Sequence, residues 1–249
     1  MNQKYIIGNW KCNMRKEDFF EWNKIFSSYS IPKNIEAIIA IPNLYLLEID
    51  KVKNKNIKIA AQDIFSKDFG AYTGRLSIEH LIDNNIKNVI IGHSEQRLYD
   101  DNSNEKINEK INWLVEKNIN VIFCIGENID IYNSNKQEEF LKEQIISGIK
   151  NIDSKNENKI IIAYEPIWAI GTNKNADTSY IEKTIKFIKS ILIELNLKIS
   201  IIYGGSVNLN NIYEIINIKD NSGVLIGNAS LKADNFINMI EKIKESSNE

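Results

Sequence analysis

Residues 159–172 read KIIIAYEPIWAIGT, and this stretch is the most informative of the chain. Its apolar run IIIA is typical of a strand that is buried on both faces of a parallel sheet. Glu165 stands where that strand ends, and Pro166 cannot continue a hydrogen-bonded ladder. The following segment carries Trp168 and Gly171 and is suited to be a lid. A carboxylate beneath a closing lid would lose water and become a stronger base.

Seven further apolar runs resemble this strand, and a helical pattern follows each of the eight. The expected strands are residues 5–11, 36–41, 57–62, 88–92, 120–125, 159–165, 199–203 and 223–227. After the sixth strand, apolar residues at three- and four-residue steps indicate a helix with one buried stripe, formed by Ile181, Ile185, Ile188, Leu192 and Leu195. Asp177, Thr178 and Ser179 offer capping oxygens at its start, and Ser179 with Glu182 fits a capping box.

Eight strand–helix units in 249 residues fit an α/β protein of the (β/α)8 barrel type, whose usual length is about 250 residues. We therefore expect one domain over residues 1–249, with eight parallel strands inside a ring of helices. A doubly wound open sheet is the alternative. Its dinucleotide-binding members carry a glycine-rich fingerprint at the first turn, which this chain lacks.

The composition limits the classes of partner that we expect the chain to bind. The formal net charge is -2, from 31 basic and 33 acidic residues, and no basic stripe points to nucleic acid or to an acidic membrane surface. No apolar run approaches the ~18 residues of a membrane span. Cys12 and Cys124 lie far apart without a paired spacing, so we expect free thiols in a reducing cytoplasm.

The residues at the ends of the expected strands carry the chemistry, because the active site of such a barrel lies at the carboxyl ends of its strands. These ends supply Asn9, Lys11, His93, Ser94, Glu95, Glu165, Gly204, Gly205, Ser206, Gly227 and Asn228. Turns that contain glycine let backbone N–H groups approach a phosphate, and the usual phosphate site follows strands seven and eight. The joint placement of these residues predicts an enzyme that acts on a small phosphorylated molecule.

Each of these residues also has an ordinary structural explanation when taken alone. A lone lysine is usually a solvated charge, and a lone histidine usually a structural one. No second histidine or acidic cluster joins His93 and Glu95, so we expect no metal site. Ser94 beside His93 is not a triad, and Cys124 has no evident base, which argues against nucleophilic catalysis.

Eight short motifs stand in order along the chain: GNWKCN (8–13), AQD (61–63), GAYTG (70–74), IGHSEQR (91–97), CIGE (124–127), AYEPIWAIGT (163–172), YGGSV (203–207) and IGNASLK (226–232). With them the chain resembles the triosephosphate isomerase family over nearly its full length. The resemblance implies a TIM barrel that interconverts dihydroxyacetone phosphate and D-glyceraldehyde 3-phosphate in glycolysis and gluconeogenesis, through an enediolate and without a cofactor.

The resemblance also implies roles for individual residues. Glu165 would be the base, and a neutral His93 would donate to the enediolate oxygens. Lys11 and Asn9 would stabilise those oxygens, and Glu95 would hold Lys11. The phosphate would be bound around Asn9, Lys11, Gly171, Ser206, Gly227 and Asn228. The lid would start with Pro166, Trp168, Ala169, Ile170, Gly171 and Thr172, and Tyr203 and Ser206 would hold it closed.

Members of the family are homodimers in which a loop such as 63–76 enters a pocket of the partner. The interface residues implied here are Cys12, Tyr72, Thr73, Gly74, Arg75 and Gln96. The family commonly has Asn at position 63 and Gly at 173 and 228, where this chain has Asp63, Asn173 and Asn228. It often pairs Glu at position 75 with Arg at position 96 across the interface.

Two other functions stay open from the sequence. One is a different metal-free barrel isomerase that acts on a sugar phosphate. The other is a non-enzymatic scaffold that has kept the fold, although such a chain has little reason to retain Lys11, His93 and Glu165 together.

Overall fold

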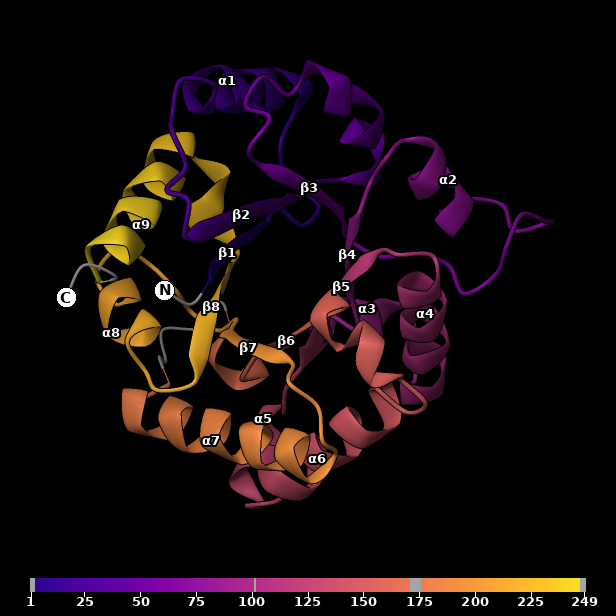
Figure 1. Ribbon diagram of the computed structural model, residues 1–249, viewed down its shortest axis with the longest axis vertical. Helices are drawn as coiled ribbons and strands as arrows, with labels where there is room; N and C mark the ends of the chain where they lie inside the picture. Colours follow the sequence, from indigo (N-terminus) through magenta and orange to yellow (C-terminus); the bar gives the residue numbers. More distant parts are fainter. Residues whose placement is uncertain (1–2, 101, 171–175, 247–249) are drawn as a thin grey trace.

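The computed structural model describes residues 3–100, 102–170 and 176–246 (Figure 1). Within these ranges eight parallel strands close into a barrel in chain order, and the first strand pairs with the last. The strands are β1 Lys4–Asn9, β2 Ile35–Ala40, β3 Lys58–Ala61, β4 Asn88–Ile91, β5 Asn120–Ile125, β6 Ile160–Tyr164, β7 Ser200–Tyr203 and β8 Asn221–Ile226. The predicted (β/α)8 barrel is confirmed.

The observed strands fall on the eight expected ranges, and the differences lie at the ends. Lys11 and Glu165 were included in expected strands but lie beyond the ends of β1 and β6. Lys11 has a backbone φ of 52°, which no strand residue adopts. At these two positions the strands end and the side chains turn toward the top of the barrel.

Helices surround the barrel in the ring that Figure 1 shows. The α-helices are α1 Lys16–Phe26, α2 Ile78–Asp83, α3 Ser94–Tyr99, α4 Asn104–Glu116, α5 Ile129–Asn133, α6 Gln137–Gly148, α7 Thr178–Glu194, α8 Ile212–Ile216 and α9 Ala233–Ser246. Four 3-10 helices in the described ranges are η1 Asn43–Lys51, η2 Ser154–Lys159, η3 Ile167–Ala169 and η4 Asn228–Leu231. The connection after β2 is therefore a 3-10 helix and not the expected α-helix. No helix in the described part of the chain is both long and apolar enough to cross a membrane.

In helix α7 the expected buried stripe is confirmed at four of its five positions. Ile181, Ile185, Ile188 and Leu192 are buried, as predicted. Leu195 is 39% exposed, because the helix ends one residue before it. The capping box expected at Ser179 is wrong. Asp177 is the N-cap residue, and its Oδ1 accepts a hydrogen bond from the Ser179 backbone N–H at 2.7 Å.

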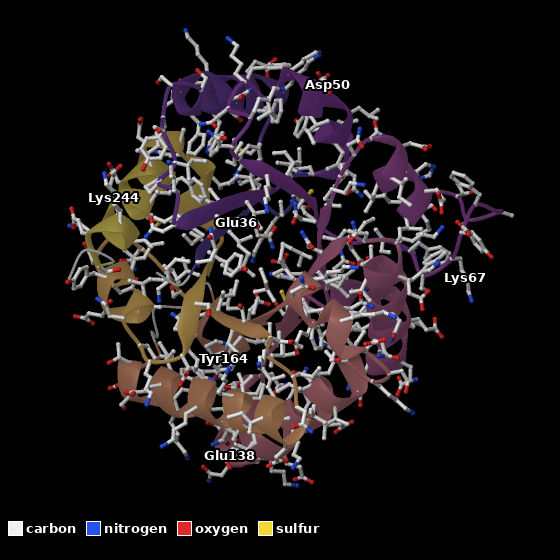
Figure 2. The ribbon with its side chains drawn as sticks, viewed as in Figure 1. Glu36, Asp50, Lys67, Glu138, Tyr164 and Lys244 are labelled. Carbon is white, nitrogen blue, oxygen red and sulfur yellow. The ribbon has the colours of Figure 1, made fainter. Side chains whose placement is uncertain are left out.

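The core has two layers. Inside the barrel, short and branched side chains from alternate strand positions form one cluster, which includes Ile7, Ile90, Ile122, Cys124 and Ile202. A larger cluster lies between the outer face of the strands and the helices. Figure 2 shows side chains filling the centre of the ring. The barrel is thus a packed body, and residues at the carboxyl ends of its strands rest on a filled floor.

Helix α9 closes the ring of helices by packing beside α1 (Figure 1). The Phe236 ring of α9 lies 6.0 Å from that of Trp22 and 5.9 Å from that of Phe26, both on α1. These aromatic contacts tie the C-terminal helix to the start of the barrel.

One loop leaves the ring. The connection between β3 and α2 projects from the barrel, and Figures 1 and 2 show it extending outward near α2, where Lys67 is labelled. Its two arms are joined by a hydrogen bond from the Phe65 N–H to the Leu76 carbonyl at 2.8 Å. The Phe65 and Tyr72 rings pack 4.9 Å apart. The loop therefore has internal structure although it lies outside the barrel.

Candidate active site

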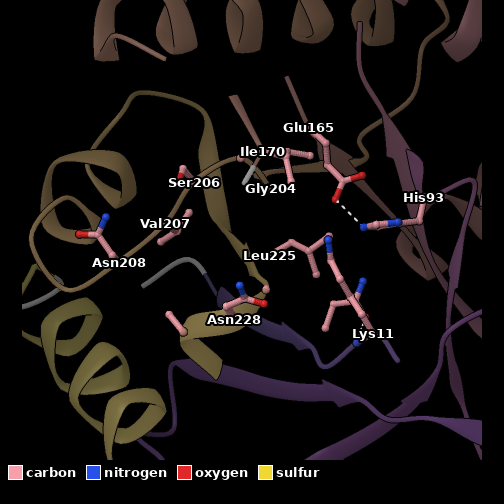
Figure 3. Close-up of a pocket in the computed structure, with 14 residues that line it drawn as sticks. Lys11, His93, Glu165, Ile170, Gly204, Ser206, Val207, Asn208, Leu225 and Asn228 are labelled. Carbon is pink, nitrogen blue, oxygen red and sulfur yellow. Dashed lines mark hydrogen bonds and ion pairs between the residues drawn. The ribbon is translucent and has the colours of Figure 1, made fainter. Parts of the chain in front are cut away.

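A pocket of about 250 Å³ opens at the carboxyl ends of the strands (Figure 3). It brings together nine residues that the sequence singled out at the strand ends: Asn9, Lys11, His93, Glu165, Gly204, Gly205, Ser206, Gly227 and Asn228. They lie at or just after the ends of β1, β4, β6, β7 and β8, so the pocket collects residues from most of the barrel. Gly171 was also expected here, but it lies outside the described residues.

Glu165 is held in place by its backbone and by two glycines. Its N–H donates to the Ile125 carbonyl at 2.8 Å, which extends the pairing of β5 and β6 by one step. A Cβ on Gly126 would overlap the Glu165 carbonyl oxygen, and one on Gly204 would lie 2.8 Å from Glu165 Cγ. From the sequence, Gly204 is expected in a turn that binds phosphate. The structure shows that its missing side chain makes room for the glutamate.

The Glu165 carboxylate is almost completely buried, with 3% of the residue exposed. Burial raises its pKa above the usual glutamate range, while His93 and the positive charge of Lys11 oppose that shift. Cys124 shares a side-chain hydrogen bond with Glu165, and burial raises the pKa of the thiol well above its ordinary value. The thiol is therefore protonated and donates to the carboxylate. This contact was not predicted from the sequence.

His93 faces Glu165 across the pocket. It is 4% exposed and caps α3, and its Nδ1 accepts a hydrogen bond from the Glu95 backbone N–H at 3.2 Å. A ring nitrogen that accepts carries no hydrogen, so a neutral His93 has its proton on Nε2. That Nε2 lies 3.4 Å from Glu165 Oε1, the pair joined by a dashed line in Figure 3. The helix thus orients an N–H donor toward the carboxylate.

Lys11 has a left-handed backbone, with a φ of 52° that is rare for a residue with a side chain. Two contacts hold it: its N–H donates to Asn9 Oδ1 at 3.0 Å, and its carbonyl accepts from Gln62 Nε2 at 2.9 Å. Its ammonium lies 2.8 Å from Glu95 Oε1, as the resemblance implied. Gln62 belongs to the AQD motif but had no predicted role. It could have been suspected only as a partly buried amide at a strand end.

Glu127 anchors the residues at which the expected lid begins. Glu127 Oε1 accepts hydrogen bonds from Trp168 Nε1 at 2.8 Å, from the Tyr180 hydroxyl at 2.9 Å and from the Tyr164 hydroxyl at 3.0 Å. Burial raises the pKa of this carboxylate, and these three donors oppose the shift. Of the expected lid residues, Pro166, Trp168, Ala169 and Ile170 are described, whereas Gly171 and Thr172 lie outside the described residues. Glu127 is a residue that sequence reasoning missed.

Of the expected interface residues, Tyr72, Thr73, Gly74 and Arg75 lie on the projecting loop, Gln96 lies at its base and Cys12 follows β1. Cys12, Tyr72, Thr73, Gly74 and Arg75 are exposed, and Gln96 is partly exposed. Within this one chain the Arg75 guanidinium pairs with Asp100 Oδ1 at 3.2 Å. In the orientation that satisfies its hydrogen bonds, the Gln96 amide donates to Asp63 Oδ2 at 3.1 Å and to Asp100 Oδ2 at 2.8 Å. Arg75 and Gln96 therefore share Asp100 within the chain.

Asp63, a position at which the family commonly has Asn, belongs to a polar cluster at the base of this loop. Its two carboxylate oxygens accept from the buried Lys110 ammonium at 2.9 and 2.8 Å. Lys110 also donates to Asn102 Oδ1 at 2.9 Å. Burial raises the pKa of Asp63, and Lys110 opposes that shift. This cluster connects the loop to α4.

No group of three or more histidine, cysteine or acidic side chains in the described ranges has the geometry to hold a metal ion. The pocket instead contains one carboxylate, one imidazole and one ammonium whose functional atoms converge. That arrangement suits proton transfer on a small anionic substrate.

Comparison with known proteins gives a consistent result. The family model described as Triosephosphate isomerase matches residues 4–243. A protein named triosephosphate isomerase from Mycoplasma mobile is 44% identical over 97% of this chain and 100% of its own length. Proteins of the same name from Campylobacter jejuni subsp. doylei and Emericella nidulans are 41% and 37% identical, over 95% and 93% of this chain and 99% and 96% of their own. Given the closed barrel, the converging site and these matches, the chain belongs to the triosephosphate isomerase family.

Proposed function

We propose that this chain interconverts dihydroxyacetone phosphate and D-glyceraldehyde 3-phosphate, with Glu165 as the base that moves a proton between the two carbons. The observation that carries this proposal is the placement of a buried Glu165 carboxylate 3.4 Å from the Nε2 of His93, in a pocket that Lys11 also lines. Removing a proton from carbon requires both a base and a group that stabilises the resulting oxyanion. The pocket has both within the reach of one three-carbon substrate.

The burial of Glu165 suits it to be the base. A carboxylate with a raised pKa binds a proton more strongly than one in water, so its ionised form is a stronger base. Cys124 donates to the same carboxylate and opposes part of the shift. Gly204 and Gly126 leave room for Glu165 to approach the substrate.

His93 and Lys11 act on the substrate oxygens. The Nε2–H of His93 points into the pocket, so it donates to the enediolate oxygens and carries their proton as the double bond shifts. Among the described residues that line the pocket, Lys11 is the one cation, and its ammonium stabilises the same oxygens together with the Asn9 amide. Glu95 is a positioning residue, because it contacts Lys11 and His93 from the side.

The other end of the pocket binds the phosphate. Ser206, Gly227 and Asn228 line this end, and they come from the turns after β7 and β8. Gly171 belongs to the same proposal. The lid that begins at Pro166 closes over the substrate and excludes water, and Tyr203 and Ser206 hold it closed. Exclusion of water strengthens every electrostatic contact inside the pocket.

The reaction places the chain in glycolysis and gluconeogenesis, without a cofactor. We also propose that residues 1–249 form one domain, a proposal supported by the packing of α9 on α1. The two cysteines are free, which is in keeping with a cytoplasmic location.

We further propose a homodimer. The projecting loop exposes Phe69 and Tyr72, and large apolar side chains are also exposed on η1 and α3: Leu44, Leu47, Leu98 and Tyr99. Exposed apolar patches of this kind mark interaction sites. The loop tip Tyr72–Gly74 would enter the partner near Cys12, and Arg75 and Gln96 would lie at its edge.

A coupled assay with each triose phosphate tests the reaction, and sedimentation of the same sample tests the dimer. We expect turnover in both directions, no loss of activity after dialysis against EDTA, and a single species of twice the chain mass. Turnover of another sugar phosphate alone would contradict the proposed reaction, and an active species of one chain mass would contradict the proposed dimer.

A further inference from the structure

The side chain of Asn228 occupies the phosphate end of the pocket. Asn228 directly follows Gly227 at the end of β8, and its side chain is exposed to the pocket that it lines. Figure 3 shows this side chain beside Leu225, between Lys11 on one side and Asn208 on the other. Both turns proposed to bind phosphate therefore have an asparagine amide near them.

The Asn228 amide makes no hydrogen bond with any described residue, and in this it differs from the other two asparagines of the pocket. Asn9 Oδ1 accepts from the Lys11 N–H at 3.0 Å, and Asn208 Oδ1 accepts from the Asn210 N–H at 2.9 Å. These two amides hold their own loops in shape. Among the contacts of the described residues, no hydrogen bond involves the side chain of Asn228. Its donor and acceptor are free to meet a ligand.

A phosphate ester is the ligand group that fits this position. Its terminal oxygens share two negative charges and accept several hydrogen bonds each, whereas Ser206, Val207 and Gly227, which also line the pocket, are neutral. An amide N–H donates to an ionised oxygen without adding charge, and such a charge-assisted bond is stronger than a neutral one. A carboxylate in the same place would repel the phosphate.

We propose that the Asn228 side-chain amide donates a hydrogen bond to the substrate phosphate and so helps to determine specificity for phosphorylated substrates. This inference rests on the proposed function and extends it, because the proposed phosphate site needs only backbone groups at this turn. The phosphate keeps its charge through the reaction, so we expect a contact to it to stabilise the bound substrate and the transition state to a similar extent. Its loss therefore changes KM and leaves kcat nearly unchanged.

The test compares Asn228→Gly, Asn228→Ala and Asn228→Asp with the wild-type enzyme. Steady-state assays give kcat, KM and the inhibition constant of inorganic phosphate, and calorimetry gives the dissociation constant of inorganic phosphate without turnover. The Gly and Ala variants should raise KM and both phosphate constants about 3- to 10-fold, as expected for one solvent-accessible bond to a charged group. The Asp variant should raise them by more than about 10-fold, since it adds repulsion.

A matched control is Asn217→Gly, an exposed asparagine just after α8 that does not line the pocket. It should leave all constants as in the wild type. Phosphate constants that stay within about two-fold of wild type in all three Asn228 variants would overturn the inference, as would tighter phosphate binding by Asn228→Gly, which would mean that the side chain obstructs the site. If the wild type binds phosphate through Asn228 but turns over neither triose phosphate, the proposed function fails and this contact stands.

Discussion

Replacing Gly204 by alanine tests whether the position of the Glu165 carboxylate controls the rate. The added Cβ would lie 2.8 Å from Glu165 Cγ and 3.4 Å from its Oε1. Real Cβ contacts almost never fall below 3.0 Å, so the glutamate must move by roughly 0.6 Å to regain ordinary contact in this close-packed site. The shift would carry the base away from its position beside His93.

The expected effect follows from the cost of misplacing a catalytic group. A displacement of about 1 Å can lower a rate by ~10²-fold. We therefore expect Gly204→Ala to lower kcat about 10- to 100-fold in a coupled steady-state assay. The inhibition constant of inorganic phosphate should change by less than about 3-fold, because the added methyl faces the base and not the proposed phosphate end. A thermal unfolding curve shows whether the variant is folded at the assay temperature.

The same substitution in a second variant enzyme distinguishes displacement of Glu165 from a general loss of structure. In a Glu165→Ala enzyme the Cγ that the new methyl would meet is absent, so Gly204→Ala should lower the residual kcat by a smaller factor there than in the wild type. The two changes should thus couple in a double-mutant cycle. A folded Gly204→Ala enzyme with more than half of the wild-type kcat, or an equal cost in both backgrounds, would refute the reasoning.

Three more outcomes are expected. Lys11→Met should lower kcat/KM by about 10²-fold or more, since the substrate oxygens lose their ammonium and Glu95 loses its partner; a loss below 10-fold would contradict the role of Lys11. Because Glu165 acts deprotonated and burial raises its pKa in the free enzyme above the ordinary 4.5, kcat/KM should fall on acidification with an apparent pKa above 4.5, and an acid limb at or below that value would be inconsistent with the site. Lys110→Met should lower the free energy of unfolding in urea by about 2–4 kcal/mol, because Asp63 loses its cation. Adding Asp63→Asn should restore most of that loss, and no recovery would mean that the Lys110–Asp63 pair does not stabilise the fold.

The strands and most residues of the site could be predicted from the sequence because each carries a local signal. Runs rich in isoleucine mark strands that are buried on both faces, as in β6. In a barrel the residue after such a run must lie at one end, so Glu165, His93 and Lys11 could be placed together without knowledge of their side-chain contacts. The eight motifs indicated the family, and the family implied the roles of these three residues.

The supporting contacts could not be predicted in this way, because they join elements that are remote in the chain. Cys124 meets Glu165 only through the register of β5 against β6. Gln62 reaches the Lys11 carbonyl across two strands, and Glu127 gathers donors from β6, η3 and α7. A single sequence has no local pattern for such contacts. The capping box predicted at Ser179 was wrong for a different reason. Asp177 offers an equivalent oxygen two residues earlier and caps the helix instead.

The most direct test of the account is the turnover of Glu165→Gln. The substitution keeps the shape of the side chain but removes the base, and general-base catalysis is typically worth ~10²–10⁴-fold. The account predicts that kcat in the coupled assay falls by at least about 100-fold, while the inhibition constant of inorganic phosphate and the thermal unfolding midpoint stay close to wild type. A folded Glu165→Gln enzyme that keeps more than about a tenth of the wild-type kcat would contradict the assignment of Glu165 as the base.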